Sequence, residues 1–413
     1  MTTNNLPHTG KVVPHHQNLT PNERAIIDSI RIPVLRNLFE DIWRVKLRLQ
    51  FTGWLQYVPP LIVTLLVFLI AGITHMLGGI QVAKGFVFVG YLLLAMEIFD
   101  LITVKFCLRP REHHPKRNDD LALFDLMRAR HSCRSFQTQK LTSADRNDLM
   151  ESVRCHSAET RLGVSPVRFE YVSAPLTVWP TVNASEFLVA IAPLEYDRLA
   201  VMDVGRSLQK IVMDATRMGL GTCWIGPGAD HESIMKHLGD RFDPKKDHII
   251  CVCAIGYKSW FIPMFIRVFN AQVSSRRLPL STLFFADQQM KEPLNVDTSP
   301  FNKFERTYEI CQWAPSSYNG QTTRSVAVMA QNEASYADTS RLERFDFYST
   351  TESRYYAPVA AGIWCANWEM GCKALGIHGH VAVLSVEERG VQDEKDLSQL
   401  PRYNLSWVLD ENL

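Results

Sequence analysis

Residues 203–226 read DVGRSLQKIVMDATRMGLGTCWIG, and residues 360–383 read AAGIWCANWEMGCKALGIHGHVAV. The two stretches align without a gap. Gly205 and Gly219 of the first then match Gly362 and Gly376 of the second, 14 residues apart in each copy. Apolar residues of the first stretch recur at the spacing of one helix face, and Gly219 stands where a glycine commonly ends a helix. The pattern predicts a helix closed by Gly219 and a second copy of that helix.

The repeat extends upstream of these helices. SADRNDLMESVRCHS (143–157) can be laid over NKFERTYEICQWAPS (302–316), and Ser157 precedes Gly205 by 48 residues while Ser316 precedes Gly362 by 46. Matched spacing in two halves indicates a duplicated unit that folds as a pseudo-dimer within one chain. We place the first half at residues 120–285 and the second at residues 295–413.

Three short runs in the first half are predicted to be buried strands, because they are continuous, apolar and rich in β-branched residues. They are FEYVS (169–173), FLVAIA (187–192) and IICVCAI (249–255). Since these strand signals alternate with helical signals, we expect an α+β fold.

Two apolar runs precede the duplicated part. No charged residue occurs from Leu49 to Ala83, and GFVFVGYLLLAMEIFDLITV (85–104) follows Lys84. Each run approaches the roughly 20 residues that a helix needs to cross a bilayer core. We therefore predict a transmembrane hairpin at residues 54–107 after an N-terminal segment at 1–53. A signal peptide fits poorly because about fifty residues precede the first run; two buried core helices are the alternative.

The charges around the hairpin predict its orientation. Basic residues lie on both outer flanks, whereas the connecting loop carries only Lys84; the flanking residues are Arg44, Lys46, Arg48, Arg109, Arg111, Lys116 and Arg117. The positive-inside rule then places both termini and the soluble halves in the cytoplasm. Glu97 and Asp100 lie within the second run. Asp100 is close to its end and could reach the membrane interface, whereas Glu97 marks either a partner contact or polar pocket, or a tolerated charge on a protein-facing side.

The overall composition argues against nucleic-acid-binding and metal-binding proteins. The formal net charge is +1, which gives no basic face for a nucleic-acid partner. The nine cysteines include no CxxC pair, and most lie in apolar runs, as buried free thiols do. We predict neither nucleic-acid binding nor a metal site.

A dense cationic segment, RARHSCRSF (128–136), opens the first half. Arg130, His131, Ser132 and Arg134 place two guanidiniums, an imidazole and a hydroxyl within five residues. Planar guanidiniums recognise phosphate in bidentate fashion. For any one of these arginines alone, a surface ion pair would be the favoured interpretation. A phosphate site is indicated only when the other motifs of the chain are considered with them.

Together with that segment, GLGTCWIG (219–226), SSRRLPLSTLF (274–284) and APSSYNGQ (314–321) resemble motifs of the FMN-dependent nitroreductase family. The resemblance covers residues 122–413 and is strongest to the subgroup in which two family-like halves are fused. It implies a duplicated fold with a mixed, mostly antiparallel sheet, FMN as cofactor and NAD(P)H as co-substrate.

The resemblance also implies roles for individual residues. Arg130 and Ser132, with His131 between them, would hold the phosphate and ribityl end of FMN. Arg134 would face the flavin pyrimidine edge and stabilise the reduced form. Arg276 or Arg277 would return to the phosphate.

Two further segments would contact the ring. Trp224, Ile225 and Gly226 would line the isoalloxazine; a plain turn between helix and strand is the alternative. The loop from the other half would reach the cofactor through the residues Pro315, Ser316, Ser317 and Asn319. The matching stretch of the first half, CHSAETRLG (155–163), lacks this pattern, so we expect one intact flavin site and one decayed site.

The sequence thus predicts a membrane-anchored FMN-dependent NAD(P)H oxidoreductase acting on a small-molecule acceptor such as a nitro compound or a quinone. No protein nucleophile or general base is expected, because the flavin carries the chemistry. The usual aromatic after NGQ is Thr322-Thr323 here. Two alternatives therefore stay open, a flavin-binding sensor without turnover and a docking subunit of a membrane assembly. Substrate, nucleotide preference and further oligomerisation are not predicted.

Overall fold

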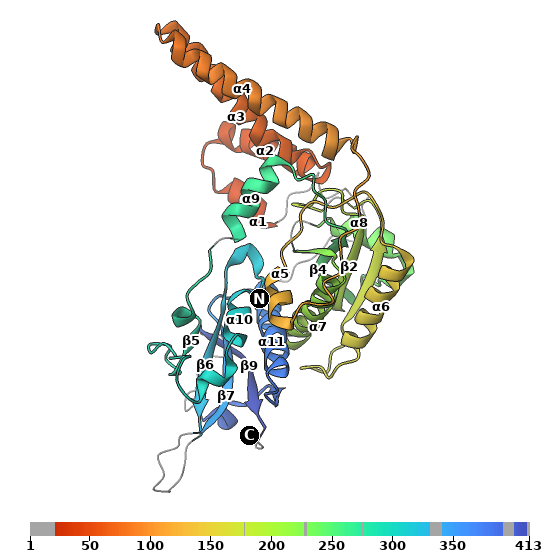
Figure 1. Cartoon of the computed structure of the whole chain (residues 1–413), viewed down its shortest axis with the longest axis vertical. Coiled ribbons are helices and arrows are strands. Elements are labelled where there is room, and N and C mark those ends of the chain that lie inside the picture. Colours follow the sequence, from red (N-terminus) through yellow and green to blue (C-terminus); the bar gives the residue numbers. More distant parts are fainter. Residues whose placement is uncertain are drawn as a thin grey trace.

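The structure is a computed structural model that describes residues 21–176, 178–226, 229–274, 276–330, 341–390 and 400–410. A helical hairpin projects from one end of a body with two lobes, and each lobe contains one sheet (Figure 1). Two long helices, α7 (Arg198–Arg217) and α11 (Tyr356–Ala374), pack against each other between the lobes.

The first lobe holds an antiparallel sheet in the order β1-β2-β4-β3. Its strands are β1 (Arg168–Ser173), β2 (Glu186–Pro193), β3 (Gly221–Ile225) and β4 (Asp247–Gly256). Three of them lie where the apolar runs predicted strands. Both faces of the central strand are covered, because Leu188 packs into the core beneath α7 while Phe187 and Val189 pack into a second core on the opposite face. The helices of this lobe are α5 (Leu123–Ala129), α6 (Ser143–Ser157), α7 and α8 (His231–Leu238).

The second lobe repeats this plan. Its sheet has the order β5-β6-β7-β9-β8, and the last four strands occupy the positions of β1, β2, β4 and β3. The strands are β5 (Phe284–Phe285), β6 (Thr323–Met329), β7 (Leu342–Ser349), β8 (Gly379–Ala382) and β9 (Arg402–Leu409). The helices are α10 (Thr307–Gln312), α11 and α12 (Val386–Arg389). The fold is therefore α+β and duplicated.

One short strand crosses between the halves. β5 lies at the end of the segment that the sequence division gives to the first half, yet it pairs in parallel with β6 of the second sheet. The connection from β4 to β5 contains α9 (Met264–Ser274), which the sequence did not predict. The first half thus supplies the edge of the second sheet.

The helices of the opening sequence form a symmetric contact. A Cβ on Gly205 would lie 2.3 Å from the carbonyl oxygen of Val359, and a Cβ on Gly362 would lie 2.0 Å from that of Met202. In the alignment Gly205 matches Gly362 and Met202 matches Val359. Each half therefore makes the same contact with the other, as in an isologous dimer interface, and only glycine allows the backbones to approach so closely.

Both helices also end in the same way. Gly219 and Gly376 adopt left-handed φ angles of 79° and 69°. In each copy the amide after the glycine donates to the carbonyl five residues earlier, at 2.9 Å. This hydrogen bond is typical of a Schellman cap. The sequence predicted that Gly219 ends its helix, and Gly376 ends the second copy in the same way.

The hairpin consists of α3 (Val58–Met76) and α4 (Ile80–Asp100), preceded by α1 (Pro21–Asp28) and α2 (Pro33–Phe51). The stretches Leu55–Met76 and Ile80–Lys105 are long and apolar enough to cross a membrane, and only 22% of each apolar window is buried. Asp100 accepts a hydrogen bond from the amide of Met264 at 2.7 Å and so holds the start of α9. Glu97 is buried, with one carboxylate oxygen lacking a hydrogen-bond partner.

Candidate functional site

Arg130 is a buried cationic side chain in the first half. It follows α5 and is only 8% exposed. Its Nη1 is buried without a hydrogen-bond partner, and within the described residues it forms no ion pair. Burial, together with the nearby charges of Arg277 and Arg134, lowers the pKa of Arg130 to about 10. A buried cation that lacks a counter-charge is costly, so this site favours an anion.

Arg277 approaches Arg130 from the segment between α9 and β5. Its Nη1 donates to Asn319 Oδ1 at 3.0 Å and to the Ala314 carbonyl at 3.3 Å. Its Nε is buried without a partner, and burial lowers the pKa of this arginine too. Arg276 points elsewhere: it is exposed, and its carbonyl accepts from the Asn319 side chain at 2.8 Å. The structure therefore brings Arg277, rather than Arg276, to the cluster.

Arg134 is the third member of this arginine cluster. Its Nη1 donates to Asn270 Oδ1 on α9 at 2.5 Å, and its guanidinium lies 5.1 Å from the ring centre of Phe269. Its Nε is buried without a partner. Because α9 also contacts α3 and α4 of the helical hairpin, Arg134 is held by an element that packs against the hairpin. Neither Phe269 nor Asn270 was predicted from the sequence.

The loop at residues 314–321 has a strained backbone. Tyr318, Asn319 and Gln321 all have positive φ, at 52°, 55° and 46°, a region that side chains other than glycine rarely adopt. The Gln321 amide donates to Ser316 Oγ at 2.9 Å, which closes the loop. Non-glycine residues held in this region are common at ligand-binding positions.

The four residues of this loop that were predicted to contact FMN, Pro315, Ser316, Ser317 and Asn319, do not share one environment. Pro315 and Ser316 line a small cavity next to Thr322. Ser317 belongs to the short helical turn η7 (Ser317–Asn319), which contacts α9. The Asn319 side chain of the second half is bonded to Arg276 and Arg277, near the end of the first half.

β3 lies beside the cationic segment. Ser132 forms a backbone bridge with Thr222, and the amide of Cys133 donates to the Thr222 carbonyl at 2.8 Å. His131 points away from this contact, because it is exposed and its Nδ1 bonds the Ala129 carbonyl at 2.8 Å. The cationic segment and the GLGTCWIG segment, which were predicted to surround one cofactor, are therefore neighbours. The His131 side chain does not face the region between them.

The three residues at the end of β3 differ in their exposure. Trp224 packs against the cores of both halves, and its Nε1 is buried without a partner. Ile225 is buried in the core of the first half, so its backbone rather than its side chain is left for a ligand. A Cβ on Gly226 would lie 3.2 Å from the ring of Tyr356, at the start of α11. Tyr356 brings the second half to this position, and this contact was not predicted from the sequence.

The first-half loop at residues 155–163 matches the strained loop at residues 314–321. Its polar groups form hydrogen bonds and ion pairs within the protein. The amides of Leu162 and Gly163 donate to the Asp203 carboxylate. Arg206 donates to the Thr160 carbonyl at 2.6 Å, and Glu159 pairs with Lys210 at 2.5 Å. The polar groups of this first-half loop are therefore already engaged within the protein.

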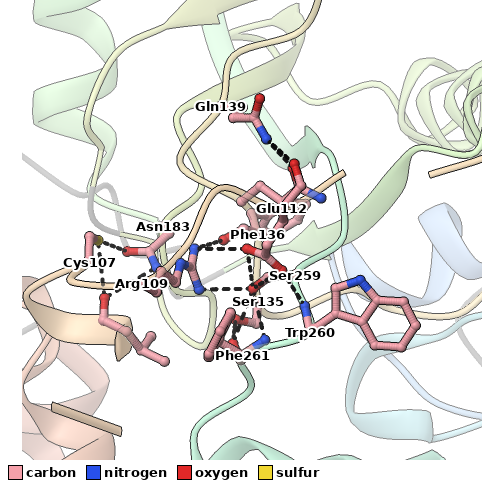
Figure 2. A network of polar contacts seen from close by, with 12 residues as sticks. Cys107, Arg109, Glu112, Ser135, Phe136, Gln139, Asn183, Ser259, Trp260 and Phe261 are labelled. Atoms are coloured by element: carbon pink, nitrogen blue, oxygen red, sulfur yellow. Dashed lines mark hydrogen bonds and ion pairs between the residues drawn. The ribbon is translucent and has the colours of Figure 1, made fainter. Parts of the chain in front are cut away.

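A buried polar network joins the hairpin to the first half (Figure 2). Arg109 follows the hairpin; it donates to Ser259 Oγ at 2.9 Å and to the Phe136 carbonyl at 3.0 Å, and lies 3.5 Å from Glu112. Glu112 accepts from the Trp260 amide at 2.6 Å. The side chains of Arg109 and Glu112 are 3% and 5% exposed. Since buried, bonded networks are rigid, Phe136, two residues after Arg134, is held to the segment that follows the hairpin.

Three guanidiniums with buried, unbonded N–H groups form an arrangement suited to a phosphate, which offers charge and several acceptor oxygens. The three arginines belong to the first half; β3 with Trp224 lies beside the cationic segment, and Arg277 contacts the strained loop of the second half. These features define a candidate site for an anionic, aromatic cofactor between the halves.

The family model described as "Putative TM nitroreductase" matches residues 122–347. The chain belongs to this nitroreductase family. No curated protein matches the chain.

Similar solved structures include a "putative nitroreductase" from Thermotoga maritima, with 14% identity and a TM-score of 0.41, covering 73% of this chain and 99% of that one. A nitroreductase with bound FMN from Bacteroides fragilis has 16% identity and a TM-score of 0.29, covering 34% of this chain and 89% of that one. The NfrA1 nitroreductase of B. subtilis has 18% identity and a TM-score of 0.30, covering 45% and 82%.

Proposed function

We propose that this chain is a membrane-anchored FMN-dependent oxidoreductase that takes a hydride from NAD(P)H and passes it to a small-molecule acceptor. The observation that supports this most is Arg130, a buried guanidinium that has no counter-charge and feels the charges of two other arginines. Membership of the nitroreductase family makes FMN the anion that the cluster fits.

The cofactor would supply the hydride chemistry. The residues of this chain bind and orient it. Arg130 and Arg277 would hold its phosphate from two separate segments of the first half, and Arg134, fixed by Asn270, would offset negative charge at the ring. Trp224 and the backbone of Ile225 and Gly226 exclude water from one side.

The membrane part of the proposal rests on the two long apolar helices and their basic flanks. We place the body and both termini on the cytoplasmic side, because the basic residues lie outside the connecting loop. Retention of the full chain in membranes through a carbonate wash tests the anchoring; release into the soluble fraction would contradict it.

The spectrum of the purified full chain tests the catalytic part. We expect a yellow protein whose flavin absorbance is bleached by NADH or NADPH without oxygen and restored by an electron acceptor. Colour without bleaching would favour the flavin-binding sensor. A colourless protein that takes up no added FMN would favour the docking subunit.

A further inference from the structure

Helix α2 carries an apolar stripe that does not pack against the body. Five large apolar side chains recur at the spacing of one helix face and are 42–56% exposed: Leu35, Leu38, Phe39, Ile42 and Val45. The helix buries other residues, Leu47 and Gln50, near its C-terminal end. Its exposed stripe is therefore additional to the face that packs in the protein.

A polar stripe runs along a different face of the same helix. Asn37, Asp41, Arg44 and Arg48 follow one another at spacings of three or four residues, and all are exposed. The helix contains four basic and two acidic residues. An apolar stripe, a separate polar stripe and an excess of basic residues are the properties of helices that lie in the membrane interface, where anionic lipids attract the basic side chains.

α2 ends at the base of the hairpin, where it joins the lipid-facing helices (Figure 1). Lys105, at the end of the second apolar stretch, donates to the Thr52 carbonyl at 2.8 Å. The Lys105 ammonium also lies 4.7 Å from the ring of Trp54, which contacts Phe106. Tryptophan and lysine are the residues that mark a membrane–water interface. The C-terminal end of α2, next to Thr52, therefore lies at the level where the bilayer would end.

We propose that α2 is an interfacial helix whose apolar stripe inserts into the lipid leaflet at the base of the hairpin. This adds a third lipid contact to the two spans. The contact goes beyond the proposed oxidoreductase function and does not depend on flavin binding; it requires only that the hairpin lies in a bilayer.

The test is a spin label placed at single positions of the full chain in vesicles of phosphatidylcholine and phosphatidylglycerol. The label replaces Leu38 of the apolar stripe or, as matched control, Asn37 of the polar face. Collisions with oxygen report lipid, and collisions with a water-soluble nickel complex report water. Leu66 of α3, which is 51% exposed, and Val164 of the first half, which is 99% exposed, supply the lipid and water references.

We expect the oxygen-to-nickel ratio at position 38 to be several-fold higher than at position 37 and close to that at position 66. A ratio at 38 equal to that at 164 would overturn the proposal, because the stripe would then face water. Low accessibility to both reagents would also overturn it and would indicate a protein occupant such as a second copy of this chain. If position 66 itself reports water, the proposed membrane anchoring fails, which is distinguishable from failure at position 38 alone.

Discussion

Within the described residues, no acidic side chain compensates the buried charge of Arg130. Its guanidinium is buried, Nη1 has no partner, and the nearest charges are those of other arginines. In the ligand-free protein such a residue destabilises the fold, because a buried charge needs compensation. A bound phosphate would remove that cost, and this contrast separates a ligand-binding role from a structural one.

Replacing Arg130 with alanine should therefore release FMN without weakening the apoprotein. Loss of a charged hydrogen bond to a desolvated phosphate costs about 1.5–3 kcal/mol, which corresponds to a roughly ten- to hundred-fold loss of affinity. FMN titration and the melting temperature of the apoprotein measure the two effects. Arg154→Ala is the control, since Arg154 pairs with Glu151 on the exposed face of α6. Equal titrations for wild type and Arg130→Ala would remove Arg130 from the site.

The sequence could predict part of this site only. Arg130 and Arg134 lie in one short motif, so local pattern was enough to find them. Arg276 and Arg277 are neighbours, and only the fold decides which of them turns inward. Asn270 contacts Arg134 across 136 residues of chain, and Tyr356 reaches Gly226 from the other half. Contacts of that kind have no local signal.

At the scale of elements, the crossing of α7 and α11 depends on two glycines. Gly205→Ala or Gly362→Ala would push a methyl group against a carbonyl oxygen of the facing helix. Overpacking typically costs about 1–3 kcal/mol, so each variant should lower the melting temperature of the detergent-solubilised chain. Gly72→Ala is the control, because a Cβ there meets nothing within 4 Å.

The two glycine variants also test the pseudo-symmetry. Equivalent contacts should lose similar stability. The double variant should lose less than the sum, because the first methyl group already separates the helices. Unequal losses, with one variant like wild type, would mean that only one of the two contacts determines the crossing.

A second prediction at this scale concerns His156 on α6, which links α6 to α7. Burial alone would lower the pKa of His156, but hydrogen bonds to Asp214 and Glu159 outweigh it and raise the pKa to about 9. The unfolded value is about 6.5. The protonated histidine thus stabilises the fold fully below about pH 6.5, and this contribution is lost as the pH rises through about 9.

Unfolding measured between pH 6 and 10 should therefore show a loss of stability that His156→Gln largely removes. His237→Gln on α8 is the control, because that side chain is exposed. An unchanged pH profile in His156→Gln would assign the loss of stability to other groups.

The elements themselves were predictable to different degrees. β1, β2 and β4 are continuous apolar runs, and the glycine caps have their own local signal, so both were found. β5 has only two residues and gains its partner from the other half. The role of Asp100 depends on Met264, 164 residues away in the chain. The features that the sequence did not predict, such as the pairing of β5 and the contact of Asp100, depend on residues that are far apart in the chain.

At the scale of the whole molecule, the duplication yields two positions related by pseudo-symmetry, and they are not equivalent. One contains the arginine cluster beside the strained loop at 314–321. At the other, Asp203 and Arg206 bond the backbone of the matching loop, and Glu159 pairs with Lys210. The same helix pair thus presents unbonded guanidiniums on one side and a closed network of ion pairs on the other.

We therefore predict one FMN per polypeptide. A homodimer of a single-unit relative would build two equal sites, but here the cationic segment occurs only in the first half and APSSYNGQ only in the second. The cationic segment and APSSYNGQ can therefore meet only once per chain. At the pseudo-symmetric position Lys210 already pairs with Glu159, so a phosphate there would have to displace a carboxylate at an electrostatic cost. Protein concentration and the absorbance of flavin released from the reconstituted full chain give the ratio, and Arg154→Ala should keep it at one. A ratio near two would show that the mirror network opens for a second cofactor. A ratio near zero after reconstitution would leave the arginine cluster without its flavin and favour the docking subunit.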